Sequence, residues 1–141
     1  MRNSTMSSWL GIDHGTKRIG VAVGDTASGI ASPLEVLPTQ PAEQALRRIG
    51  DLARQYGAEG VVVGLPLNMD GTEGPQAALA RQLADQIAQA GWTVRMFDER
   101  LSSFAADQAL AGMLTRKKKK ARQDAVAAAT MLQDFLAAQN R

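Results

Sequence analysis

Three carboxylates far apart in the chain indicate the chemistry that this sequence could perform. Asp13 lies inside an apolar segment, Glu99 directly follows another, and Asp124 shares a helical stripe with Ala128, Met131 and Phe135. Burying a carboxylate is costly unless a cation pairs with it. If the three acids converge, their repulsion predicts one or two divalent cations, Mg²⁺ or Mn²⁺, between them. Such a site cleaves phosphodiesters, because two ions about 4 Å apart can activate a water and stabilise the leaving oxygen.

Two of these acids also have structural interpretations. Asp13 could be a hairpin-turn acid or an ion-pair partner of Lys17 or Arg18. Asp124 could be the N-cap of the last helix and accept backbone N–H bonds there. From the pattern alone, the cap and the metal ligand are both compatible with Asp124.

The acids Asp98 and Glu99 are consecutive, and we expect only one of them to face the site. The other would pair with Arg100 or with solvent, and we favour Glu99 as the ligand. The only histidine, His14, falls on the strand face opposite Asp13 and is interpreted as a packed or surface residue. A Ser-His-Asp hydrolase is therefore disfavoured.

The elements that must position the acids follow from apolar periodicity. Residues 9–14 and 19–23 alternate as strands, and residues 30–37, interrupted by Pro33, indicate a third strand at a sheet edge. A helical period starts at Ala42 and stops at Gly57. The continuous apolar run 61–65 is typical of a central parallel strand.

The second half of the chain adds helices and one more strand. A helix is predicted from Pro75 until Gly91, a strand over residues 92–97, and a helix capped by Ser102 or Ser103 and running through Leu110. A last helix follows the basic run and reaches almost to Arg141. The predicted fold is α/β: a mixed five-stranded sheet, with three antiparallel strands and then parallel ones, flanked by helices. Ligands collect at the strand ends of such sheets.

Length and composition predict one domain, residues 9–141, after a flexible N-terminal tail over residues 1–8. The sequence has no apolar run of membrane-spanning length, no signal-peptide pattern and no cysteine. We therefore expect a cytoplasmic protein without membrane association.

The basic charge is concentrated in one segment. The chain has 16 Lys and Arg and a net charge of +2, and six of these basic residues fall within residues 116–122, so the rest of the chain has a net charge of 2 − 6 = −4. The segment is either a solvated face or a phosphate-binding patch. Asn68, Thr72 and the N–H groups of the following helix could also hold a phosphate, although we favour a simple turn as the interpretation.

Four blocks of sequence resemble the YqgF family, in that family's order: GIDHGTKRIGVAVGD, VVVGLPLNMDGTEG, FDERLSS and RQDAVAAATMLQDFL. The resemblance covers nearly the whole chain, from Leu10 to Phe135. It implies an RNase H-like fold related to the RuvC resolvases. Members are described as Holliday junction resolvases and as nucleases that mature the 5′ end of pre-16S rRNA.

The resemblance also implies roles for individual residues. The family's acids fall on Asp13, Glu99 and Asp124, which are the residues reached from the pattern. Lys17 and Arg18 are implied to lie near the site with the basic segment and to grip backbone phosphates. The candidate nucleic-acid contacts are Lys17, Arg18, Asn68, Arg100, Arg116, Lys117, Lys118, Lys119, Lys120 and Arg122.

We therefore expect a Mg²⁺- or Mn²⁺-dependent endonuclease acting on structured nucleic acid, with precursor ribosomal RNA preferred. One alternative is a Holliday junction resolvase, which needs two active sites and hence a homodimer. Another is a nucleic-acid-binding module that keeps the fold without cutting. The Asp-x-Gly-Thr pattern at Asp13 also resembles the phosphate loop of actin-like and sugar-kinase ATPases, but those proteins need a second domain.

Overall fold

A computed structural model describes residues 7–101 and 116–139, with side chains described for 7–101 and 125–139. Its elements are β1 (Ser8–His14), β2 (Arg18–Asp25), β3 (Ala31–Pro38), α1 (Ala42–Gln55), β4 (Ala58–Leu65), α2 (Pro75–Gln89), β5 (Thr93–Asp98), the short 3₁₀ helix η1 (Glu99–Leu101) and α4 (Arg116–Gln139). The helix expected between Ser102 and Leu110 lies outside the described residues.

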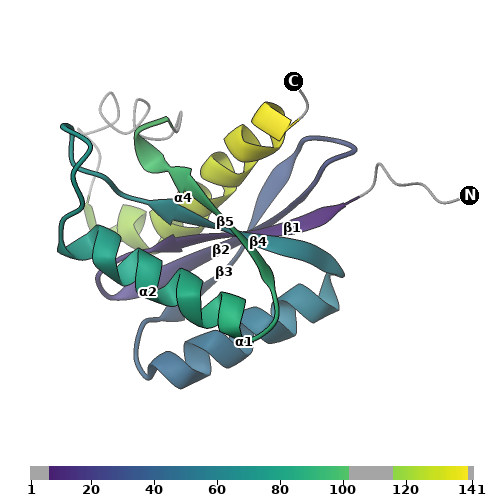
Figure 1. Cartoon of the computed structure of the whole chain (residues 1–141), viewed down its shortest axis with the longest axis horizontal. Helices are drawn as coiled ribbons and strands as arrows, with labels where there is room; N and C mark the ends of the chain where they lie inside the picture. The colour runs from purple at the N-terminus through teal and green to yellow at the C-terminus, as the bar shows by residue number, and fades with distance from the viewer. Residues whose placement is uncertain (1–6, 102–115, 140–141) are drawn as a thin grey trace, which may run out of the picture.

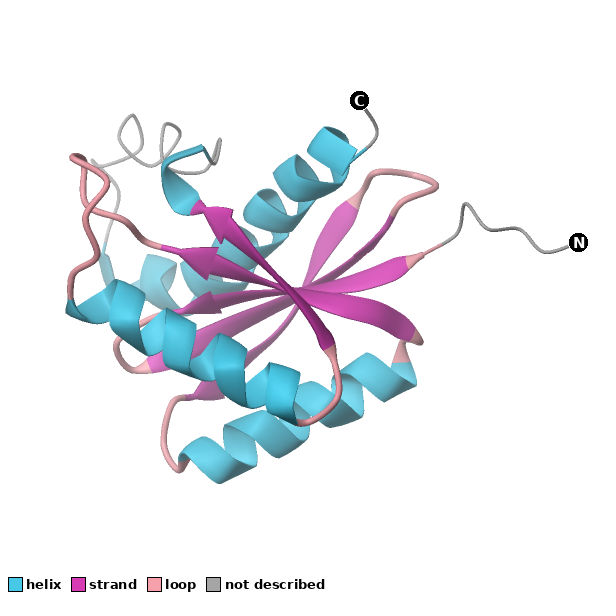
Figure 2. Cartoon of the chain, in the orientation of Figure 1, coloured by secondary structure: helices cyan, strands magenta, loops and turns pink. Residues whose placement is uncertain are grey.

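The strands form one sheet in the order β3-β2-β1-β4-β5. β1 pairs antiparallel with β2, and β2 with β3, whereas β4 is parallel to both β1 and β5. Helices α1 and α2 cover one face of the sheet and α4 covers the other (Figures 1 and 2). The predicted mixed sheet is confirmed, and the strand that contains Pro33 lies at its edge.

Both faces of the sheet are packed, as the alternation in β1 requires. Leu10 and Ile12 are fully buried in the core beneath α1 and α2. Trp9 belongs to the opposite core, where its ring centroid lies 5.3 Å from that of Phe135 on α4. Asp13 is four residues after Trp9, so the alternation places it on the same face of the sheet, which is the α4 side.

Glycines on this face allow α4 to approach the sheet closely. A Cβ on Gly11 would lie 2.8 Å from the Leu132 Cβ and 3.1 Å from the Ala128 carbonyl oxygen. A Cβ on Gly60 would lie 2.5 Å from the Trp9 ring. Side chains at these positions would push the helix or the indole away from the strands.

Helix α4 begins earlier than the sequence predicts. The apolar period starts near residue 125, yet the helix begins at Arg116 and includes the basic segment. Lys and Arg are strong helix formers, so this segment can be helical without an apolar period. The prediction that Asp124 opens the helix, and with it the N-cap interpretation, is wrong: Asp124 is an interior residue of α4. None of the helices that the structure describes is both long and apolar enough to span a membrane.

Candidate active site at the carboxyl edge of the sheet

The parallel strands bring two of the predicted acids together. β1, β4 and β5 run in the same direction, so their carboxyl ends share one edge of the sheet. Asp13 is the penultimate residue of β1, and Glu99 is the first residue after β5. The two carboxyl groups interact directly across the end of β4, which lies between these strands.

Gly64 on β4 provides the space for this contact. The pairing of β1 with β4 runs to Ile12 opposite Val63, and the next position in that register places Gly64 beside Asp13. A Cβ on Gly64 would lie 2.6 Å from Glu99 Oε2 and 3.1 Å from Glu99 Cδ. The absence of a side chain at residue 64 therefore lets the Glu99 carboxyl group lie against the strand backbone.

The environment of Glu99 disfavours its charge. Burial, followed by the charge of Asp13, raises the pKa of Glu99 from 4.5 to about 8. In its protonated form Glu99 hydrogen-bonds to Asp13. The oxygen Oε2 is buried, and no group among the described residues forms a hydrogen bond to it. A half-buried pair of carboxyl groups in which one buried oxygen has no partner among the described residues suits a hard divalent cation, whose preferred ligands are oxygens.

The neighbouring acid Asp98 has a different partner. Arg100 Nη2 lies 2.8 Å from Asp98 Oδ2, and the Arg100 backbone N–H donates to Asp98 Oδ1. This ion pair holds the pKa of Asp98 below its usual range. Of the two consecutive acids, Asp98 is neutralised by arginine and Glu99 lies against Asp13.

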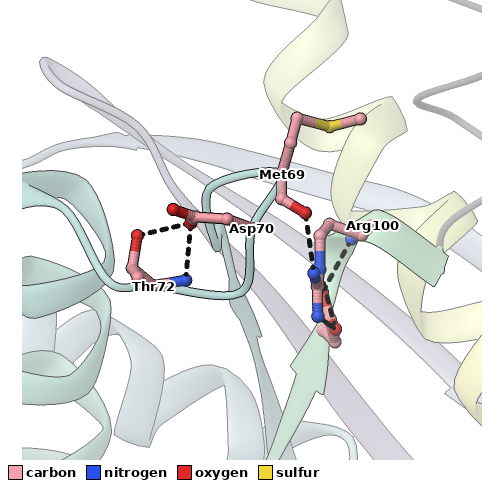
Figure 3. A network of polar contacts seen from close by, with 5 residues as sticks. Met69, Asp70, Thr72 and Arg100 are labelled. Atoms are coloured by element: carbon pink, nitrogen blue, oxygen red, sulfur yellow. Dashed lines mark hydrogen bonds and ion pairs between the residues drawn. The ribbon is translucent and has the colours of Figure 1, made fainter.

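Arg100 also connects the end of β5 to the loop between β4 and α2. Its Nη1 donates to the Met69 carbonyl oxygen at 3.3 Å (Figure 3). In the same loop Asp70 accepts hydrogen bonds from the backbone and hydroxyl of Thr72, and Asn68 donates to the Thr72 hydroxyl. The loop thus satisfies its own polar groups, as the simple turn interpretation requires, and α2 begins without a side-chain cap.

The third predicted acid, Asp124, lies in α4, but its side chain is not among those described. Of the side chains that the structure does describe, no three Asp, Glu or His residues group into a metal site. The described part of the site is therefore the Asp13–Glu99 pair.

The predicted basic contacts lie at several places around this edge. Lys17 is exposed in the turn between β1 and β2, and Arg18 is half-buried at the start of β2. Asn68 and Arg100 are exposed but engaged in the contacts given above. The side chains of the basic segment, Arg116, Lys117, Lys118, Lys119, Lys120 and Arg122, lie outside those described.

His14 is packed rather than directed at the acids. Gln76 on α2 donates a hydrogen bond to the His14 carbonyl oxygen at 2.8 Å, and its side-chain nitrogen lies 3.5 Å from His14 Nδ1. Burial lowers the pKa of His14. Sequence reasoning missed both Gln76 and the role of Gly64, although a glycine inside the apolar run 61–65 is a visible signal of close backbone approach.

Two solved structures of RuvC proteins are similar to this fold. The structure matches Thermus thermophilus RuvC in complex with a Holliday junction substrate with a TM-score of 0.56 and 18% sequence identity, covering 95% of this chain and 96% of that one. A second Thermus thermophilus RuvC structure matches with a TM-score of 0.54 and 19% identity, covering 94% and 96%. At this identity the likeness establishes a RuvC-like, RNase H-like fold.

Sequence comparison then gives the family. Residues 7–138 match the family model RuvX, described as Holliday junction resolvase. A Chloroflexus aggregans protein named "Putative pre-16S rRNA nuclease" is 46% identical over 90% of this chain and 91% of its own length. A protein of the same name from Anaeromyxobacter sp. is 45% identical over 90% of this chain and 94% of its own length. The chain belongs to the RuvX family, a family of nucleases, and the predicted resemblance is confirmed.

Proposed function

We propose that this protein is a divalent-metal-dependent endonuclease that cleaves phosphodiester bonds in structured RNA, at the 5′ end of precursor 16S rRNA. The observation that carries the proposal is the contact between the Asp13 and Glu99 carboxyl groups, with Glu99 Oε2 buried and lacking a partner among the described residues. A pair of acids in this position is unfavourable for stability and is explained by a cation held between them.

The ligands proposed for one or two Mg²⁺ or Mn²⁺ ions are Asp13, Glu99 and Asp124. The docking of α4 on β1 supports the assignment of Asp124. Trp9 contacts Phe135, and two residues later Gly11 meets Ala128 and Leu132. Asp13 comes two residues further along the strand, and Asp124 precedes Ala128 by about one turn of the helix. This course of the backbone supports the proposal that Asp124 belongs to the part of α4 beside Asp13.

A bound cation would polarise the phosphodiester and lower the pKa of an attacking water. The protein residues supply the rest of the arrangement. Gly64 leaves space for the Glu99 carboxyl group. Arg100 forms an ion pair with Asp98, so that of the two consecutive acids only Glu99 is available to the cation. The cores on the two sides of β1 fix the direction of Asp13.

Binding of the substrate strand is assigned to basic and polar residues around the same edge. Lys17 and Arg18 flank the end of β1, and Asn68 and Arg100 belong to the neighbouring loop and strand end. The basic segment of α4 begins the helix that continues to Asp124. These residues contact phosphates, which provides affinity without choice of sequence.

The choice of precursor rRNA rests on the names of the relatives at 45–46% identity. The family description favours a second candidate, resolution of a four-way DNA junction. That reaction needs two active sites, so it requires a homodimer. The two candidates share the metal site and differ in the substrate.

The test is cleavage of a labelled precursor 16S rRNA fragment and of a synthetic four-way DNA junction, side by side, in Mn²⁺ and in Ca²⁺. Asp13→Asn is the negative control. We expect cleavage of the RNA at a defined position in Mn²⁺ and none with Ca²⁺ or with the variant. Cleavage of the junction alone would show that the substrate is a DNA junction and not precursor rRNA. Binding of RNA with no cleavage above that of Asp13→Asn would show that the protein binds nucleic acid without cutting it.

A further inference from the structure

A cavity lies on the opposite face of the sheet from the acids, at the same edge. It has a volume of about 150 Å³ and lies between the end of β1, the start of α1 and the middle of α2. His14, the residue after Asp13, forms part of its wall. The cavity is therefore one strand residue away from the proposed metal site.

The lining of this cavity combines polar and apolar side chains. Three glutamines, Gln40, Gln82 and Gln86, line it together with His14, while Ile19 and Leu83 supply apolar walls. Ile19 is 1% exposed and Leu83 is 5% exposed, so these walls are fixed parts of the core. A carboxamide offers both a donor and an acceptor in one plane, as does a base edge.

A neighbouring contact anchors His14 in this wall. The Gln76 carboxamide donates to the His14 carbonyl oxygen and approaches its Nδ1, so the direction of the strand end is fixed by α2. Gln82 and Gln86 are one turn apart on the same helix and therefore share a face. Polar groups from β1, from α2 and from the segment before α1 thus meet around one small apolar-walled space.

We propose that this cavity receives a single unstacked nucleobase of the substrate strand, next to the nucleotide whose phosphate reaches Asp13 and Glu99. The proposal rests on the proposed function and deepens it by assigning base recognition to residues outside the metal site. Recognition of RNA sequence relies on unstacked bases whose edges are hydrogen-bonded in pockets of this kind.

The turn between β1 and β2 is the surface along which the bound nucleic-acid strand would pass from the acids to the cavity. Exposed Lys17 lies in this turn, and the turn is tied to the cavity's border because Thr39 N donates to the Lys17 carbonyl oxygen at 3.1 Å. Thr39 itself lines the cavity. A phosphate held by Lys17 would place one neighbouring nucleotide toward Asp13 and the other toward the glutamines.

Another cavity on this face, of about 250 Å³, does not fit this role. It is lined by residues such as Ile87 and Trp92, which lie at the end of α2 and just before β5. Because β5 runs toward Glu99, that cavity is at the far edge of the sheet. A strand bound at the acids could not place the adjacent nucleotide there.

The first test uses His14 as a unique reporter, because it is the only histidine in the chain. The imidazole proton signals are followed by NMR at constant pH without metal, during titration with AMP, CMP, GMP and UMP, and with ribose 5-phosphate as the base-free control. We expect saturable shifts that depend on the base and are absent with ribose 5-phosphate. Equal shifts from ribose 5-phosphate, or no base-dependent shift, would overturn the proposal.

Variants locate the base in the cavity. The double variant Gln82→Leu/Gln86→Leu should weaken the preferred mononucleotide about tenfold, as expected for the loss of two hydrogen bonds. Gln89→Leu, an exposed residue at the end of the same helix, should leave the affinity unchanged. Equal affinities in the wild type and the double variant would contradict the assignment.

A cleavage assay separates this proposal from the function on which it rests. RNA fragments randomised at the nucleotides flanking the cleaved bond are cut by the wild type and by the double variant. We expect the wild type to prefer one base at one flanking position and the variant to lose that preference while still cleaving. Cleavage with identical preferences in both proteins overturns the base pocket alone, whereas absence of cleavage in the wild type overturns the nuclease proposal and leaves the NMR result to decide the pocket.

Discussion

The Glu99 carboxyl group occupies the space that a side chain at residue 64 would need, because a Cβ on Gly64 would lie 2.6 Å from Glu99 Oε2. A strand glycine is thus part of the candidate site, although it has no functional group. The absence of a side chain at Gly64 explains why Glu99 can come close to Asp13, although β4 separates the two strands at whose ends these acids lie.

Replacing this glycine should damage the site more than the fold. Gly64→Ala is expected to displace Glu99 and weaken Mn²⁺ binding at least about tenfold, with an equivalent loss of cleavage. The matched control is Gly50→Ala in α1, where a Cβ meets only the Arg54 guanidinium at 3.6 Å. Calorimetric Mn²⁺ titration measures both variants; unchanged affinity in Gly64→Ala would contradict the role given to this residue.

Neutralising Glu99 should stabilise the metal-free protein. Burial and the charge of Asp13 force the Glu99 carboxyl group to take up a proton on folding at neutral pH, and Glu99→Gln removes this cost. We therefore expect the free energy of unfolding in EDTA to rise by about 1 kcal/mol, while protection by Mn²⁺ is lost. Asp98→Asn is the comparison, because it breaks an exposed ion pair with Arg100 and should lower stability by less than about 1 kcal/mol. Urea unfolding with and without Mn²⁺ gives both values. If Asp98→Asn abolished the Mn²⁺ effect and Glu99→Gln preserved it, the assignment of the two acids would be reversed.

Metal-free stability should fall as the pH rises. The pKa of Glu99 is about 8 in the folded protein against an ordinary value of 4.5, so between these pH values the folded state binds more protons than the unfolded state. The free energy of unfolding therefore decreases with pH through this window. Urea unfolding in EDTA at several pH values measures the slope, and Mn²⁺ should restore stability at the upper end. A slope equal to that of Glu99→Gln would show that Glu99 does not titrate in this way.

The docking of α4 should link stability to activity. Gly11→Ala introduces a Cβ 2.8 Å from the Leu132 Cβ and 3.1 Å from the Ala128 carbonyl oxygen, so the helix must move away from β1. We expect a loss of about 1–3 kcal/mol in the free energy of unfolding. Because Asp124 lies on this helix, cleavage by the folded variant should also fall. Full activity in the folded variant would argue against a ligand on α4.

Most of the fold could be predicted from the sequence because its signals are local. The alternation of Trp9 and Leu10 separates two cores, Pro33 marks the edge strand, and Gly57 and Gly91 adopt positive φ where they end α1 and α2. The start of α4 was missed, since a run of Lys and Arg favours a helix by propensity and has no apolar period.

The site was only partly predictable, because its decisive features depend on neighbours from other strands. The sequence indicates that Asp13 and one of Asp98 and Glu99 reach the same edge. It leaves open whether Arg100 or solvent pairs with Asp98, since that pairing also depends on the position of the Met69 carbonyl in another loop. The space at Gly64 and the bond from Gln76 to His14 likewise follow only from the three-dimensional arrangement.

The most direct test is the affinity of the metal-free protein for Mn²⁺, measured by isothermal titration calorimetry in the wild type, Asp13→Asn, Glu99→Gln and Asp124→Asn. The control is Asp85→Asn, which removes one exposed charge from α2. Shared coordination predicts that each of the three site variants binds Mn²⁺ at least about tenfold more weakly and that the control binds like the wild type. Equal affinity in all five proteins, or an equal loss in the control, would contradict a cation held between these acids.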